Sequence, residues 1–259
     1  MNPKILASSL LLSAIPAFGA SVIVNEINAY TNANTPVGGQ LGDWFEVVVV
    51  GDGTAGSTVD MRSWSFRIDN NGVTGLGFFQ LSNHSYWSNV VAGTILTFHE
   101  DNAGALGVDT SILGTNNLVT QGWAHTNIWV GDSTYVNTTN PSHDVDYPID
   151  NQNAQVAIFD SASTLIFGPA GENHAGYAGT GVGSDEVFKL EEAPSPLITL
   201  TSAYNDGGTQ TFGRPNEWTI VDAPNGVQNF SAFKLVPEPS GTAIAALGLL
   251  GIGLRRRRA

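Results

Sequence analysis

Short apolar runs separated by tight-turn residues dominate this chain, and they restrict it to a fold built from strands. The runs are rich in Val, Ile, Phe, Trp and Thr, which favour strands, and no long stretch carries apolar residues at helical spacing. Turn signals separate the runs, as at Asp52-Gly53, Asn70-Asn71-Gly72, Asp206-Gly207-Gly208 and Asn225-Gly226. We predict strands over 21–27, 44–50, 62–68, 77–81, 95–99, 127–130, 155–159, 164–167, 186–190, 217–221 and 231–236. This pattern predicts an all-β protein, a β-sandwich.

The residue pattern within several runs predicts which side chains are buried. Residues 64–68 alternate, which places Trp64, Phe66 and Ile68 on one buried face. The run 47–50 is continuously apolar, so we expect a strand covered on both sides. Residues 155–167 read as one hairpin.

Motifs near both ends of the body resemble the lamin tail domain, an Ig-like β-sandwich. The sequence Val22-Ile23-Val24-Asn25-Glu26-Ile27 is similar to that family's opening strand, 43–47 to the next, and 59–66 to its V-D-L-S-G-W-S-L strand. At the far end, 211–214, Trp218 and 224–229 resemble the closing pattern. The resemblance implies an Ig-like sandwich over 20–235, with 101–153 as a long insertion.

The last residues form a three-part tail. It opens with a motif that proline keeps extended and open to a protease: Pro237, Glu238 and Pro239. An apolar run over 241–254 would span about 21 Å as a helix, short of the ~30 Å hydrocarbon core. Four arginines follow, and we expect them on the cytoplasmic side: Arg255, Arg256, Arg257 and Arg258. This order resembles the PEP-CTERM sorting tail of Gram-negative bacteria, which implies recognition by the membrane protease-transpeptidase exosortase.

The first residues have the pattern of a secretory signal peptide. Lys4 precedes an apolar stretch over 5–14, and Ala17-Phe18-Gly19 offers small residues at the positions that signal peptidase reads. Without residues 1–19 and the tail, the body keeps 22 acidic groups against five basic ones, a net charge near −17. Such a charge argues against nucleic acid as a partner. Cysteine is absent, which excludes thiol catalysis and disulfides.

Glu26 and Glu46 are the first candidates for acid/base chemistry. Facing carboxylates could act as they do in glycosidases, but both lie in predicted strands, so we expect them to bond to backbone or arginine partners. The five histidines are His84, His99, His125, His143 and His174. They are scattered, without the spacing of a metal site.

An acidic segment offers a candidate calcium site. Asp144, Asp146 and Asp150 could supply several of the six to eight oxygens that Ca²⁺ needs. The spacing lacks the glycine and bidentate glutamate of an EF-hand, and a solvated acidic loop is the alternative.

Aromatic residues beside polar and glycine-rich segments could stack on sugars: Tyr86, Trp87, Trp123 and Trp129. Aromatic side chains in a sandwich more often fill the core. The resembled sorting system makes extracellular polysaccharide a candidate partner.

These observations predict an exported protein with a signal peptide over 1–19, a body over 20–235 and a sorting signal over 236–259. The implied partners are signal peptidase and exosortase, with an inner-membrane intermediate before the cell surface or extracellular space. We expect a non-enzymatic structural or adhesive role. The alternatives are a Ca²⁺-assisted carbohydrate-binding module and a secreted hydrolase.

Overall fold

Strands make up most of the regular structure of the protein. The computed structural model describes residues 19–28, 43–70, 72–100, 116–149, 153–172, 187–207, 210–219 and 225–236. Within these ranges the helical elements are two short 3-10 turns, η1 (Ser85–Asn89) and η3 (Ser231–Phe233). The predicted all-β class is therefore confirmed.

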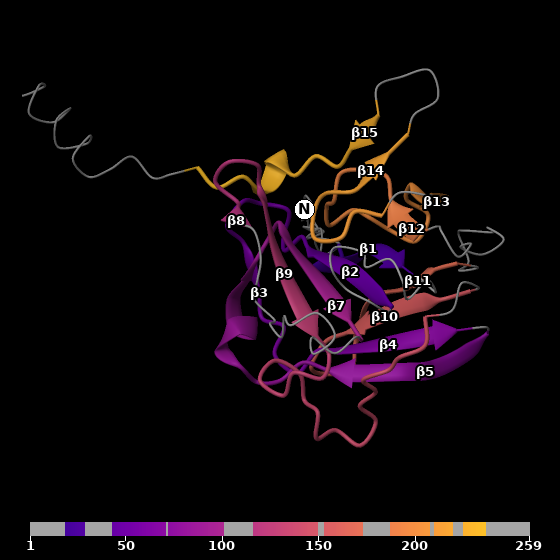
Figure 1. Ribbon diagram of the computed structural model, residues 1–259. Coiled ribbons are helices and arrows are strands. Elements are labelled where there is room, and N and C mark those ends of the chain that lie inside the picture. The colour runs from indigo at the N-terminus through magenta and orange to yellow at the C-terminus, as the bar shows by residue number, and fades with distance from the viewer. Residues whose placement is uncertain are drawn as a thin grey trace, which may run out of the picture.

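A seven-stranded sheet carries most of the fold (Figure 1). Its strands, in order across the sheet, are β13 (Tyr204–Gly207), β12 (Val187–Leu190), β1 (Val22–Asn28), β2 (Trp44–Val49), β7 (Thr94–His99), β9 (Trp123–Trp129) and β8 (Asn116–Asn117). Neighbouring strands are antiparallel except β7 and β9, which are parallel.

A four-stranded sheet faces the larger one. Its order is β11 (Leu165–Gly171), β10 (Gln155–Phe159), β4 (Ser65–Asn70) and β5 (Val73–Gln80), with β4 and β5 along the lower edge of Figure 1. Two short ladders complete the described strands: β3 (Thr58–Val59) with β6 (Val90–Val91), and β14 (Glu217–Trp218) with β15 (Gly226–Val227). The predicted hairpin over 155–167 is confirmed as β10 and β11.

Aromatic rings from both sheets form the centre of the core. Phe45 and Phe98 come from the large sheet, and Phe66 and Phe79 from the small one. All four are fully buried, and their ring centroids lie 4.7–6.0 Å apart. Rings at this spacing add to the free energy from area burial. The two sheets therefore pack as a sandwich around one aromatic cluster.

The outer face of the large sheet is covered as well. Residues 210–219 and 225–236, which we call the C-terminal arm, lie against it (Figure 1, orange to yellow). Phe212 of the arm meets the fully buried Trp44 edge-on, with ring centroids 5.2 Å apart. The run 47–50 is fully buried, as expected of a strand covered on both sides. Trp64, Phe66 and Ile68 are also buried, as predicted.

Some local predictions differ from the structure. Residues 231–236 were predicted as a strand, but they begin with η3, because the buried Phe230 and Phe233 are three residues apart, the period of a 3-10 turn. Asp206 and Gly207 were predicted in a turn, but they lie in β13, paired with β12. The described part of 101–153 supplies β8, β9 and the fully buried ring of Tyr147, which packs on Phe45 in the core.

The predicted signal peptide and sorting helix lie almost entirely outside the described residues. Among the described residues, the structure holds no helix with the length and apolar character needed to cross a membrane.

Replacing Phe66 with alanine tests the aromatic core. Phe66 contacts three other core rings, so Phe66→Ala is expected to lower the free energy of unfolding by about 3–5 kcal/mol. Leu165→Ala, at a side chain that is 49% exposed, serves as the control and should change it little. Denaturant titration of the purified proteins measures both, and similar losses in the two variants would contradict this description of the core.

Candidate functional site

Glu26 and Glu46 lie opposite each other on neighbouring strands, beneath the C-terminal arm. They are Cα partners in the pairing of β1 with β2, and both are fully buried. A bulge at Asn25 shifts the register of β1 between Val24 and Glu26, which turns Glu26 to the outer face of the sheet. Two carboxylates thus share one water-excluded site.

The arm supplies hydrogen-bond donors to both carboxylates. The backbone N–H of Thr211 donates to Glu26 at 3.0 Å, and the Thr211 hydroxyl donates to the same carboxylate. The backbone N–H of Gly213 and the hydroxyl of Thr97 donate to Glu46 at 2.5 and 2.7 Å. The expectation that these glutamates bond to backbone partners is therefore confirmed.

Burial keeps protons on this pair. Loss of solvation raises the pKa of Glu26 to about 7. The pKa of Glu46 rises to about 8, first through burial and then through the nearby charge of Glu26. Like charges this close oppose double ionisation, so at neutral pH the pair holds at least part of a proton. Lys189, the β12 partner of Glu26, donates to the carbonyl of Glu217 and moderates the negative charge.

His125 extends the buried network from Glu46. Its Nε2 lies 3.0 Å from the Thr97 hydroxyl oxygen. The Thr97 hydroxyl has a single hydrogen, so when it donates that hydrogen to Glu46, Nε2 of His125 is the donor to the Thr97 oxygen. Burial lowers the pKa of His125 to about 4, with a smaller contribution from His99, so the ring is neutral at pH 7. Sequence reasoning missed this link, although Thr97 and His125 both occupy outer-face positions of adjacent strands.

A second set of buried amides holds the arm next to the glutamates. The side-chain nitrogen of Asn216 donates to the backbone carbonyls of Asn25 and Leu190, at 3.0 Å each. Gln228 donates to the Asn25 side chain at 2.9 Å and to the same Leu190 carbonyl at 3.0 Å. The Thr211 hydroxyl oxygen also lies 2.8 Å from Asn216 Oδ1, and its one hydrogen serves either Asn216 or Glu26 at a time. We call the buried residues Asn25, Glu26, Glu46, Thr97, Thr211, Asn216 and Gln228, together with the half-buried His125, the polar junction.

The arm ends where the predicted sorting motif begins. Phe230 and Phe233 are buried, and the Leu235 N–H donates to the Leu118 carbonyl at 2.9 Å. Val236, by contrast, is 85% exposed. The chain therefore leaves the body one residue before Pro237. The sorting residues Pro237, Glu238 and Pro239, and the four arginines over 255–258, lie outside the described residues.

The other candidate residues do not assemble into a metal site within the described ranges. Asp144 accepts the backbone N–H of Asp146 at 3.1 Å, which is a local turn contact. No group of three His, Asp or Glu side chains in the described part of the chain is placed to hold a metal ion. Asp150 and His174 fall outside that part, so calcium binding stays a prediction.

Three of the four candidate sugar-stacking aromatics are occupied within the body. Trp87 is fully buried and donates from Nε1 to the Tyr135 carbonyl at 2.8 Å. The Tyr86 hydroxyl lies 2.6 Å from that of Thr126. Trp129 donates from Nε1 to the Glu100 carbonyl. Trp123 lines a groove.

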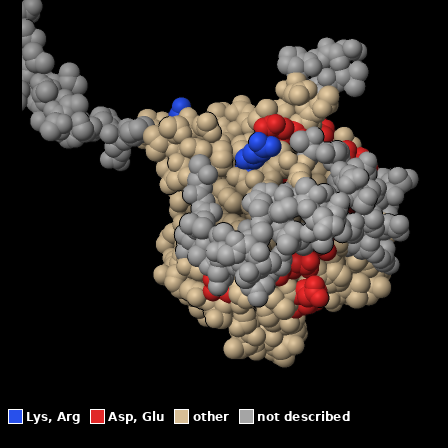
Figure 2. All heavy atoms as spheres, viewed as in Figure 1, with Lys and Arg blue, Asp and Glu red and all other residues tan. Residues whose placement is uncertain are grey.

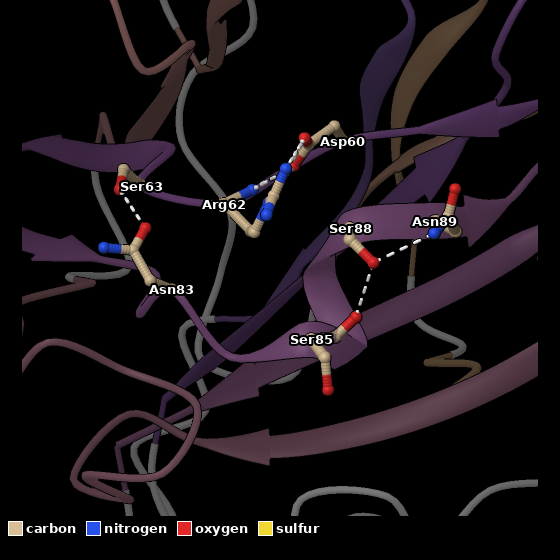
Figure 3. A network of polar contacts seen from close by, with 7 residues as sticks. All are labelled: Asp60, Arg62, Ser63, Asn83, Ser85, Ser88 and Asn89. Carbon is tan, nitrogen blue, oxygen red and sulfur yellow. Dashed lines mark hydrogen bonds and ion pairs between the residues drawn. The ribbon is translucent and has the colours of Figure 1, made fainter.

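A cavity of about 930 Å³ lies at the start of the body and includes Asp52 and Asp60. Both carboxylates are bound to neighbours. Asp52 accepts from Thr54, and Asp60 forms a 2.5 Å ion pair with Arg62 (Figure 3), whose hydrogen bonds hold the pKa of Asp60 below its ordinary value. Nearby, the Ser63 hydroxyl bonds to Asn83 at 2.8 Å (Figure 3). These contacts organise exposed loops and bring no reactive groups together.

Comparison with known proteins identifies the tail. Residues 235–258 match the family described as the PEP-CTERM protein-sorting motif. Neither a curated protein nor a solved structure matches the chain. The chain is thus an exported protein that exosortase sorts to the cell surface, as its tail predicted.

Substituting Gly213 tests how closely the arm fits the sheet. Gly213 has φ +71°, and an added Cβ would lie 2.6 Å from the His125 ring. Gly72 has a similar φ of +76° with open space around it. Gly72→Ala should lower the free energy of unfolding by about 1–2 kcal/mol, because alanine is strained in the left-handed conformation. Gly213→Ala should lower it by a further ~1–3 kcal/mol, because the added methyl group overpacks against the His125 ring. Equal losses in thermal unfolding would show that the arm does not pack tightly on His125.

The raised pKa values predict that stability falls with rising pH. Below the ordinary glutamate value of 4.5 both states are protonated, and the contribution of the pair is fully present. Above it, the folded state keeps protons that the unfolded state releases. Stability should then fall by up to about 1.4 kcal/mol per pH unit for each retained proton. The loss ends as the pH passes the folded values of about 7 and 8.

Glu46→Gln checks this assignment. The variant keeps an acceptor for Gly213 but removes one titrating group and the like charge beside Glu26. Denaturant unfolding at pH 5 to 8 should therefore show a markedly shallower slope than in the parent protein. An unchanged slope would mean that other groups cause the pH dependence.

Proposed function

We propose that the body acts at the cell surface or in the extracellular matrix as a structural or adhesive component without enzymatic activity. The observation that carries this proposal is that the buried carboxyl groups of the body hold the C-terminal arm against the sheet. Glu26 and Glu46 are fully buried and accept hydrogen bonds from the arm. A general base must reach the proton that it removes, and no substrate reaches these carboxylates unless the arm is displaced.

We further propose that the body is a lamin tail-like, Ig-like sandwich over 20–235. The support is that the two stretches carrying the resemblance meet in the polar junction. Asn25 and Glu26 belong to the opening motif, and Thr211 and Gln228 belong to the closing one. At position 63 the quoted pattern has glycine, and Ser63 adopts φ +60°, a conformation that glycine adopts without strain.

The proposed processing sites flank the body closely. The Ser21 carbonyl accepts the N–H groups of Val50 and Gly51 at 2.9 and 3.0 Å. Cleavage by signal peptidase after Gly19 would therefore leave the first sheet contacts intact. At the other end, exosortase would act within a few residues of the exposed Val236, from an intermediate held in the inner membrane.

Tags on either side of the sorting motif test the route. Replacing Pro237, Glu238 and Pro239 with alanine should leave export intact but keep both tags in the membrane fraction. The parent protein should lose the distal tag and deliver the proximal one to the surface. Alanine at 240–242 is the matched control and should be processed normally. Identical processing of the parent protein and the motif variant would contradict recognition of Pro-Glu-Pro.

The same strains test the proposed role. Cells with the motif variant should lose surface attachment or cell–cell aggregation, because the body no longer reaches its destination. Cells with Glu46→Gln should keep it, since the proposal assigns no chemistry to that carboxylate. Loss of attachment with a folded, surface-located Glu46→Gln protein would contradict a non-enzymatic role.

A further inference from the structure

A groove separates the start of β9 from the C-terminal arm. It encloses about 490 Å³, within the range of small-ligand sites. Phe230 and Gln228, both buried, line it together with the half-buried Trp123. The groove is separate from the sorting tail.

Trp123 presents a fixed aromatic surface in this groove. Its backbone is paired with Asn117 of β8, and the next residue, Ala124, is paired with β7. Its indole N–H donates to the Gln121 side chain at 2.9 Å, so the polar edge of the ring is already satisfied. What the ring offers to a ligand is therefore its apolar face. A rigid, pre-oriented ring loses little conformational entropy on binding.

The rim of the groove carries planar polar groups of balanced charge. Arg214 and Glu217 lie 3.9 Å apart and are about half exposed, at 53% and 45%. The amides of Gln121 and Asn229 complete the rim, and the Asn229 oxygen accepts the Ser231 N–H at 2.9 Å, which orients that side chain. Together these groups can donate to and accept from hydroxyl groups in several directions.

The charge of the surroundings excludes an anionic ligand. The body has a net charge near −17, and Figure 2 shows acidic side chains outnumbering basic ones on the face in view. Arg214 is paired with Glu217, so no uncompensated cation in the rim attracts a carboxylate or sulfate group. The fitting ligand has an apolar face, many hydroxyl groups and no charge.

We propose that this groove binds a neutral polysaccharide, with the face of one sugar ring stacked on Trp123 and its hydroxyl groups bonded to the rim. This inference rests on the proposed surface role and names the partner of the body. Sorting by the tail does not depend on the groove, so the two proposals fail in different experiments.

Affinity electrophoresis of the full chain tests the proposal. Gels contain dextran, galactomannan or β-glucan as neutral probes, and alginate as the acidic one. The protein should be retarded by at least one neutral polymer and not by alginate. Trp123→Ala should weaken the association constant about tenfold, the order expected for loss of one aromatic stacking contact, and Trp123→Phe should restore most of it. Trp129→Ala, on the same strand but outside the groove, should bind as the parent protein does.

Folding is checked by the melting temperature of each variant. If Trp123→Ala fails to fold, the exposed rim variant Arg214→Ala takes its place and should weaken binding several-fold. The proposal is overturned if no neutral polymer retards the protein, if only alginate does, or if the folded groove variants bind as tightly as the parent. Normal surface sorting of a non-binding protein would overturn this inference alone.

Discussion

The buried hydrogen bonds between Glu26, Glu46 and the C-terminal arm are the contacts on which the outer layer of the molecule depends. A carboxylate removed from water costs several kcal/mol unless donors replace its hydration. Here the arm supplies those donors, through the backbone N–H groups of Thr211 and Gly213. Without the arm, both glutamates would lose these donors. The arm in turn covers Trp44 and the other apolar side chains of that face.

The polar junction also fixes the point at which the chain leaves the folded body, just before the sorting motif. Asn216 and Gln228 hold the arm to β1 and β12, and buried phenylalanines hold its last turn. Only Val236, highly exposed, separates this anchored end from Pro237. Because the anchor is fixed, the last described residue, Val236, has a defined place on the surface. A membrane protease thus meets the motif next to a folded domain.

Local patterns in the sequence predicted much of the fold, but they could not predict which distant strands pair with each other. The alternation around Phe66 and the continuous apolar run 47–50 indicate which faces of these strands are buried, and both predictions are confirmed. The parallel pairing of β7 with β9 joins segments about thirty residues apart and leaves no local signal. The sequence predicted that the two glutamates bond to backbone groups. It did not predict which residues supply these groups, because Glu26 and Thr211 are separated by 185 residues.

The polar junction also joins the two segments on which the proposed lamin tail-like fold rests. Asn25 and Glu26 can be buried only if donors and acceptors from the closing segment reach them. A change at either end would leave a buried polar group without a partner, so the two motifs depend on each other physically. The described part of 101–153 contributes one side chain to the junction, that of His125. That segment is thus much freer to depart from the pattern, as it does here, while the two ends keep it.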